Sequence, residues 1–174
     1  MSQFMPRPPS EAGGNSSTRF YELELNSGFK NGLIRVQNYN HSPILGLCKK
    51  QGLISRIQYV VNIPKDYIAG TNVLVRVFWS VPVVLDPTQQ ISWLATYKFD
   101  QVGSEIYTPL YTQALQSING AQTIVDTDTM LVIPGAQIVP GSIFTLGIER
   151  GFPDDTYDSM VRVHSVRIEY VSNL

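Results

Sequence analysis

Few side chains in this sequence could carry nucleophilic catalysis. His41 and His164 are the only histidines, and Cys48 is the only cysteine. A catalytic nucleophile needs a neighbouring base and a third group that orients that base. His41 lies in a turn and His164 inside an expected strand, Cys48 follows an apolar stretch typical of a small core residue, and no Gly-x-Ser-x-Gly elbow occurs. We therefore predict that the chain is not an enzyme and has neither catalytic residues nor a cofactor.

The acidic residues Asp154, Asp155 and Asp158, with Glu149 nearby, form the most site-like cluster. Calcium takes about six to eight oxygen ligands, and the spacing here does not match an EF-hand loop. Aspartates in a turn also accept hydrogen bonds from backbone N–H groups, and Arg150 is close enough in sequence to pair with them. We expect this structural turn and no metal site, with calcium as the alternative.

Four aromatic residues fall in expected loops and are candidates for surface contacts. They could pack against another subunit or stack on sugar rings, and exposed single aromatics are also common without any function. These residues are Tyr107, Tyr111, Phe152 and Tyr157.

The composition narrows the class of protein. The chain has 174 residues, enough for one domain, with 43% hydrophobic and only 16% charged residues, below the usual level of about 25%. Interface cores are depleted in charge, so this favours contacts with other proteins. The formal charge of -1 argues against nucleic-acid binding. We find no signal peptide and no membrane-spanning apolar run, and a single cysteine permits no intrachain disulfide, so we expect synthesis in a reducing cytoplasm without membrane attachment.

Apolar residues recur with a period of two from Arg19 onward, which is typical of strands with one buried face. The segment Val73–Trp79 is apolar on both faces and predicts a central, covered strand. The alternation changes phase near His164 and Ser165, which predicts a β-bulge. Residues 108–117 are the one stretch that reads as a short helix or a loop. The alternating segments are 21–25, 34–37, 56–63, 91–99, 144–149 and 161–171.

Turns containing Gly, Pro, Asn and Asp separate these segments at regular intervals, as in a sandwich or barrel. The predicted fold is all-β: a single jelly-roll-like antiparallel β-sandwich over residues 19–174. Residues 1–18 contain three prolines followed by a Gly-Gly-Asn-Ser-Ser tract, and we expect an extended, flexible N-terminal arm. The residues of the arm that we expect to contact the capsid or another subunit are Phe4, Met5, Arg7, Pro8 and Pro9.

Several short motifs, in order, resemble a β-sandwich domain of tailed-bacteriophage structural proteins. The resemblance covers about Ile57 to Tyr170, and residues 99–124 depart from the simpler pattern of that family. It implies a jelly-roll-like sandwich, often trimeric, on capsid or tail surfaces. The matching stretches are Ile63–Tyr67, Asn72–Ser80, Ile91–Tyr97, Arg150, Asp154–Asp158 and Val166–Tyr170.

From these features we expect a virion structural protein assembled in the host cytoplasm. The first hypothesis is a homotrimeric capsid decoration (cement) protein on the capsid surface, which binds the major capsid protein and other virion proteins and stabilises the shell. The alternative is a tail-fibre or baseplate module that recognises a host-surface glycan through its loop aromatics. A hydrolase is a third class, for which we expect no activity.

Overall fold

The computed structural model describes ten segments of the chain, and the expected arm residues 1–15 lie outside them. These segments are residues 16–24, 29–31, 34–39, 42–48, 55–84, 86–99, 110–127, 131–138, 141–150 and 154–173. Within them the structure has twelve strands, one turn of 3₁₀-helix, and no helix long and apolar enough to cross a membrane.

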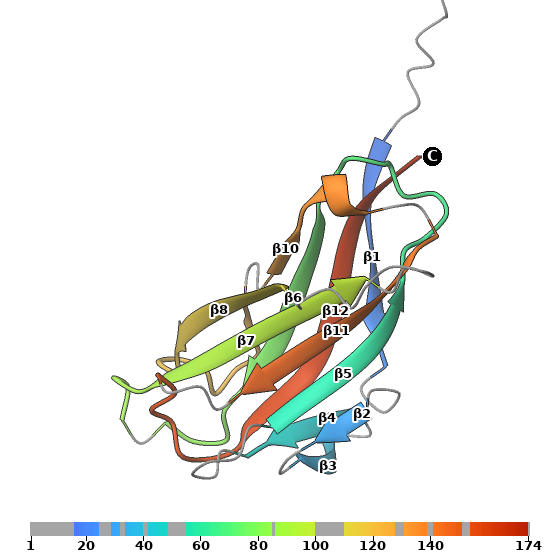
Figure 1. Ribbon diagram of the computed structural model, residues 1–174. Coiled ribbons are helices and arrows are strands. Elements are labelled where there is room, and N and C mark those ends of the chain that lie inside the picture. Colours follow the sequence, from blue (N-terminus) through green and yellow to red (C-terminus); the bar gives the residue numbers. More distant parts are fainter. Residues whose placement is uncertain are drawn as a thin grey trace, which may run out of the picture.

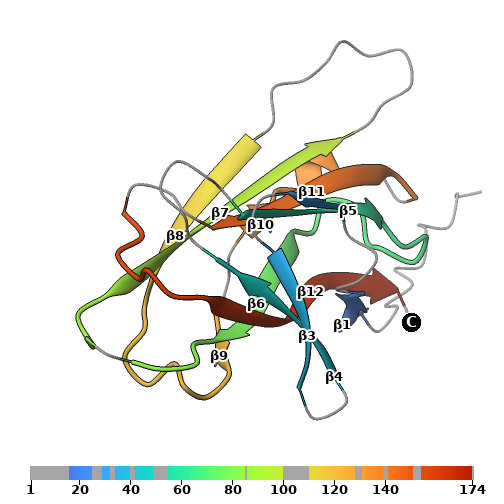
Figure 2. The same ribbon diagram turned by 90° about the horizontal axis from the view of Figure 1, so that it is seen from below.

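The strands form two antiparallel sheets that pack face to face (Figures 1 and 2). The seven-stranded sheet, here called sheet A, contains β1 (Ser16–Leu23), β3 (Ile34–Tyr39), β4 (Ser42–Leu47), β6 (Val73–Ser80), β9 (Val125–Asp126), β10 (Leu131–Ile133) and β12 (Val161–Asn173). The five-stranded sheet, sheet B, contains β2 (Phe29–Asn31), β5 (Ser55–Asn62), β7 (Gln90–Phe99), β8 (Leu110–Ser117) and β11 (Ile143–Arg150). In Figure 2, β5, β7, β8 and β11 lie above β1, β6 and β12.

Eight of these strands are wound as a jelly roll. The hairpin β7–β8 is the innermost pair, and β6 with β10, β5 with β11 and β4 with β12 enclose it in turn. This nested hairpin is folded over so that β12 also pairs with β6 and β11 also pairs with β7. The resulting orders are β10-β6-β12-β4 and β5-β11-β7-β8, which confirms the predicted jelly-roll-like all-β class.

The two-residue alternation places one side of each strand in a shared core. In β5, β6, β11 and β12 the residues predicted to face inward are buried, and Trp79 of β6 meets Trp93 of β7 across the sheets with ring centroids 6.0 Å apart. A buried aromatic side chain contributes roughly 4–6 kcal/mol of gross hydrophobic free energy. This Trp pair therefore joins the two sheets near the end of β11, where Trp93 lies opposite Arg150.

The predicted bulge in the last strand is confirmed. The register of β12 against β6 shifts between Val163 and Ser165, so His164 is the extra residue. Val161 and Val163 face the core before the shift, and Val166 and Ile168 face it afterwards. The bulge thus lets one long strand keep its apolar side inward along its whole length.

Two predictions about elements were wrong, and one was too strong. Residues 110–117 form strand β8 rather than a helix or loop, because antiparallel pairing along the edge of β7 from Gln90 to Tyr97 outweighs local propensity. The first strand begins at Ser16, not Arg19, since residues 16–18 pair with the end of β12. Val73–Trp79 is central, as β6, but Leu74 and Phe78 on its outer face are only half-buried.

A close backbone approach fixes the turn of 3₁₀-helix η1 (Gly135–Gln137) against the β5–β6 connection. The N–H of Gly135 donates to the Asn72 side-chain oxygen at 3.1 Å. A Cβ at position 135 would collide with backbone atoms of Gly70 and Thr71. Only glycine therefore lets η1 lie against this connection.

We predict that Gly135→Ala lowers the free energy of unfolding by about 1–3 kcal/mol, because the added methyl group has only backbone to displace. Ala136 is exposed in the same turn, so Ala136→Ser should change it by less than about 0.5 kcal/mol. Urea unfolding followed by tryptophan fluorescence measures both variants. Equal stability of Gly135→Ala and wild type would contradict the close approach.

Candidate functional site

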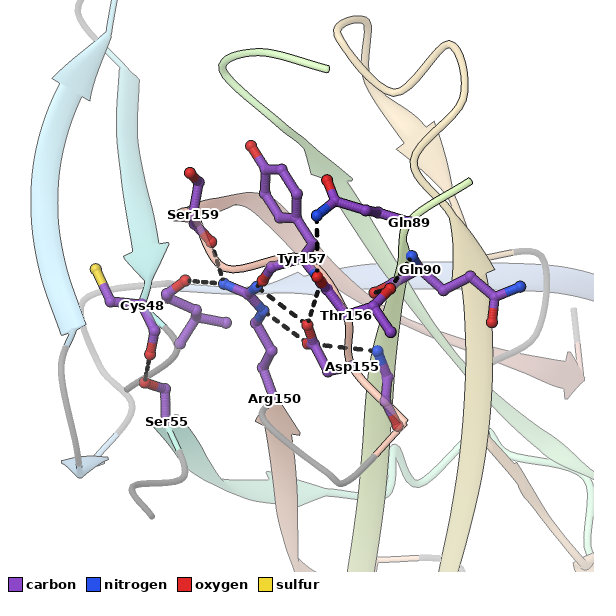
Figure 3. A network of polar contacts seen from close by, with 11 residues as sticks. Cys48, Ser55, Gln89, Gln90, Arg150, Asp155, Thr156, Tyr157 and Ser159 are labelled. Atoms are coloured by element: carbon purple, nitrogen blue, oxygen red, sulfur yellow. Dashed lines mark hydrogen bonds and ion pairs between the residues drawn. The ribbon is translucent and has the colours of Figure 1, made fainter. Parts of the chain in front are cut away.

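The most elaborate polar cluster in the described part of the chain surrounds Arg150, the last residue of β11 (Figure 3). Its side chain is fully buried, and each of its five N–H donors has an acceptor. Nε and Nη2 bind the two carboxylate oxygens of Asp155 at 2.9 and 3.3 Å. Nη1 donates to the carbonyls of Leu47 and Ser159 at 2.7 and 2.6 Å, and Nη2 to the carbonyl of Tyr157. One guanidinium thus ties sheet B to β4 of sheet A and to the β11–β12 connection.

Asp155 completes this cluster, and both oxygens of its carboxylate accept hydrogen bonds from protein groups. Besides Arg150, its carboxylate accepts the backbone N–H groups of Tyr157 at 3.1 Å and Ser92 at 3.4 Å. This confirms the expected turn in which an aspartate accepts backbone N–H groups and pairs with Arg150. Its neighbours Asp154 and Asp158 are exposed, and no cation-binding group of three such side chains forms among the described residues.

Tyr157 was predicted as a surface contact, and that prediction was wrong. Only 1% of the residue is exposed. Its hydroxyl donates to the Val83 carbonyl at 2.9 Å, and its ring centroid lies 5.6 Å from the Arg150 guanidinium carbon. Burial raises the pKa of its phenol above the ordinary value. The ring therefore fills the space between the Arg150 cluster and the β6–β7 connection.

Thr156 extends the same cluster to the start of β7. Its N–H donates to the Gln90 carbonyl at 2.9 Å, and its hydroxyl accepts the Gln90 N–H at 2.8 Å. The Gln89 side chain donates to the Thr156 carbonyl at 3.1 Å. These bonds tie the β11–β12 connection to β7 at one end of the sandwich.

We predict that Arg150→Met destabilises the fold by about 3–5 kcal/mol, because it leaves the Asp155 carboxylate buried and unpaired. Adding Asp155→Asn removes that charge while keeping an oxygen for the backbone N–H groups, so the double variant should be more stable than Arg150→Met alone. Urea unfolding measures both.

Arg19→Met is the control, since Arg19 pairs with Asp66 at the surface and should contribute less than about 1 kcal/mol. Additive losses in the double variant would contradict the assigned coupling between Arg150 and Asp155.

His164 at the bulge forms a second polar contact. Its Nε2 lies 2.8 Å from the hydroxyl oxygen of Ser80, which is itself buried. Burial, followed by the positive charge of Arg162, lowers the pKa of the imidazole below its ordinary value. The neutral imidazole therefore links β12 to β6 at the point where their register shifts.

We predict that this contact weakens at acid pH. Because the pKa of His164 is lower in the folded chain, the unfolded chain binds a proton first, and the free energy of unfolding falls as pH drops from about 6.5 through the folded pKa. Unfolding at about pH 7.5 and about pH 5 measures the loss in wild type and in His164→Gln. The difference between the two proteins isolates His164, and an equal loss in both would contradict its lowered pKa.

Two further residues of interest are partly or fully covered. Cys48 is half-buried, and its carbonyl accepts the Ser55 hydroxyl at 2.6 Å. Glu149 is 2% exposed and lies on the outer side of sheet B, where its Oε1 is 2.5 Å from Nη2 of Arg56. This contact is an ion pair rather than an aligned hydrogen bond. Glu149 is close in sequence to the turn that contains Asp155, but its side chain is on the outer side of sheet B and is not part of the Arg150 cluster.

Exposed apolar side chains occur on the outer faces of both sheets, and none of them was predicted as a contact residue from the sequence. On sheet A, Phe20 is 58% exposed and Val132 44%; on sheet B, Val60 is 70% exposed and Leu115 49%. The exposure of Phe20 could have been predicted from the sequence, because the two-residue alternation places Phe20 on the same face as the charged Glu22. These residues leave contact surface on both sides of the sandwich.

The remaining predicted contact residues are not placed by the structure. Tyr111 lies in β8, with its side chain outside the described residues. The predicted arm contacts Phe4, Met5, Arg7, Pro8 and Pro9, together with Tyr107, Phe152 and His41, also lie outside them.

Comparisons with known proteins support the fold alone. No protein-family model matches the chain, and no curated protein sequence is similar to it. A xylan-binding module, CBM15, has a TM-score of 0.50 and 11% identity, covering 88% of this chain and 97% of that one. The enzymatically active domain of tailspike protein 4 of bacteriophage CBA120 has a TM-score of 0.46 and 10% identity over 92% of this chain, which spans only 19% of the tailspike chain. A chain of infectious bursal disease virus, Gx strain, has a TM-score of 0.42 and 12% identity over 99% of this chain and 41% of that one.

Proposed function

We propose that the chain is a virion structural protein of a bacteriophage, most specifically a capsid decoration protein that binds the major capsid protein. The observation that carries the proposal is that a polar cluster is buried inside the fold, whereas apolar side chains are exposed on its surface. The Arg150 cluster uses its polar groups to hold the fold together, whereas Phe20, Val60 and Leu115 present apolar surface on the two outer faces. Such a surface suits adhesion to other proteins better than turnover of a substrate.

The low content of charge supports the same role. Neutral polar residues replace the missing charges, and a surface of this kind is desolvated at low cost when subunits meet. The motif resemblance from Ile57 to Tyr170 adds the expectation of a homotrimer on the virion surface. In a trimer each weak contact with the shell is made three times, so attachment gains strength from multivalency.

The N-terminal segment supplies the second part of the proposal. Strand β1 begins at Ser16, which lies opposite Asn173. We propose that Phe4 and Met5 bind an apolar site on the major capsid protein or on a neighbouring trimer. The prolines between positions 6 and 9 would limit the entropy lost on binding.

The alternative is a tail-fibre or baseplate module that binds a host glycan, and one of its four candidate aromatic residues is not available for binding. Tyr157 is buried and cannot stack on a sugar, which leaves Tyr107, Tyr111 and Phe152 as aromatic candidates. The likeness to a xylan-binding module concerns the fold, not a ligand. Glycan-array binding that is lost in Tyr107→Ala would favour this alternative.

We predict that deleting residues 1–15 reduces binding to purified capsids at least tenfold, roughly the effect of losing one of two linked contacts. The deletion stops before Ser16 so that β1 stays intact. Co-sedimentation of the full chain and the deletion variant with capsids measures binding.

A matched variant, Phe4→Ser with Met5→Ser, keeps the segment's length and should lose most of the same affinity. Undiminished binding of the deletion variant would refute the arm, and absence of binding by the full chain to any virion component would refute the virion role.

A further inference from the structure

Strand β1 is a long edge of sheet A that remains open within the described structure. It pairs along one side with β12, in unbroken register from Ser16 opposite Asn173 to Leu23 opposite Val166 (Figures 1 and 2). Among the described residues, its other side has no backbone partner. The N–H and C=O groups on that side can therefore pair with another strand.

Three features that often protect an edge strand, namely shortness, proline and a β-bulge, are missing from β1, whose charged residues are Arg19 and Glu22. It has eight residues, no proline and no register shift, whereas the other edge of sheet A consists of the two-residue β9 and three-residue β10. Long, regular edges of this kind attract a further strand unless something blocks them.

An exposed aromatic residue stands in the middle of this edge. The ring of Phe20 is covered on one side by Arg167, whose guanidinium carbon is 4.2 Å from the ring centroid and 4.6 Å from that of Phe78. Arg167 also donates to Glu22 at 3.0 Å. Phe20 is thus held in place before any partner arrives, which lowers the entropic cost of binding.

We propose that β1 pairs antiparallel with β1 of a second copy of the chain, about a two-fold axis perpendicular to sheet A. Such a pair is isologous, so each copy uses the same residues, and the two sheets become continuous across the interface. This proposal does not depend on the virion role. A two-fold contact cannot close a trimer, so in a trimeric protein it joins subunits of different trimers.

The charges on β1 select the register of this pairing. Centring the axis on Arg19 would place two arginines directly opposite each other, and centring it on Glu22 would do the same with two glutamates. Like charges in opposite positions are destabilising. Centring the axis on Phe20 places Arg19 opposite Tyr21 and Glu22 opposite Thr18, so no like charges meet.

The remaining central register is less favourable. Centring the axis on Tyr21 would place Phe20 opposite Glu22, an aromatic ring against a carboxylate. In the register centred on Phe20, the two Phe20 rings meet on the outer face, and paired aromatic residues stabilise antiparallel sheets. The exposed ring and the charge pattern therefore favour the same register.

Disulfide cross-linking tests the pairing directly. Cβ atoms of opposite residues lie about 4.5–5.5 Å apart, within reach of a disulfide after a small shift. In a Cys48→Ser background, Phe20→Cys should oxidise to a covalent dimer at least about tenfold faster than two controls, because pairing raises the local thiol concentration. The controls are Leu115→Cys on β8, the long edge of sheet B, and Val132→Cys on the other edge of sheet A, which are 49% and 44% exposed in the wild-type protein.

A charge variant tests the same interface without a covalent bond. Phe20→Lys places two ammonium groups opposite each other, so it should halve the mass measured by light scattering, whereas Val132→Lys should leave it unchanged. Unfolding curves of both variants confirm that each is folded. Cross-linking at position 20 no faster than at 115 and 132, or a mass that Phe20→Lys does not alter, would overturn the proposal.

Discussion

The fold depends on how one buried positive charge is neutralised. Arg150 lies where β11 ends, at the margin between the two sheets, and water does not reach its guanidinium. Each of its N–H groups must therefore find an acceptor within the protein, because an unpaired charge there would cost several kcal/mol. The course of residues 155–159 satisfies this need: it brings Asp155 and the carbonyls of Tyr157 and Ser159 to the same point as the Leu47 carbonyl.

This constraint separates the parts of the surface that can vary from those that cannot. The connections at the Arg150 end are fixed by hydrogen bonds to β4, β7 and the β6–β7 connection. On the outer faces of the sheets, by contrast, the apolar residues Phe20, Val60 and Leu115 are exposed. We expect contacts with other molecules on these faces and on the edges of the sheets.

Much of the fold could be predicted from the sequence, because strand alternation is a local property. The bulge at His164 was also predictable, because the hydrophobic alternation changes phase there. The pairing of Asp155 with Arg150 was predictable because the two residues are only five positions apart. Strand β8 was missed because its stability comes from pairing with β7, which no local pattern reveals. Tyr157 was misplaced for a related reason: its burial depends on Val83 and Arg150, which lie on other elements. The arm contacts remain predictions.

The nested winding of the strands has a consequence for how the protein is made. β12, the last described strand, lies in the interior of sheet A, between β6 on one side and β4 and β1 on the other. Sheet A cannot form before residues 161–173 have been synthesised, so the earlier strands of that sheet wait with unsatisfied edges. The pairing of β1 with β12 is a long-range event, and long-range β pairing is slow. We therefore expect this pairing to be a late step in the folding of the domain.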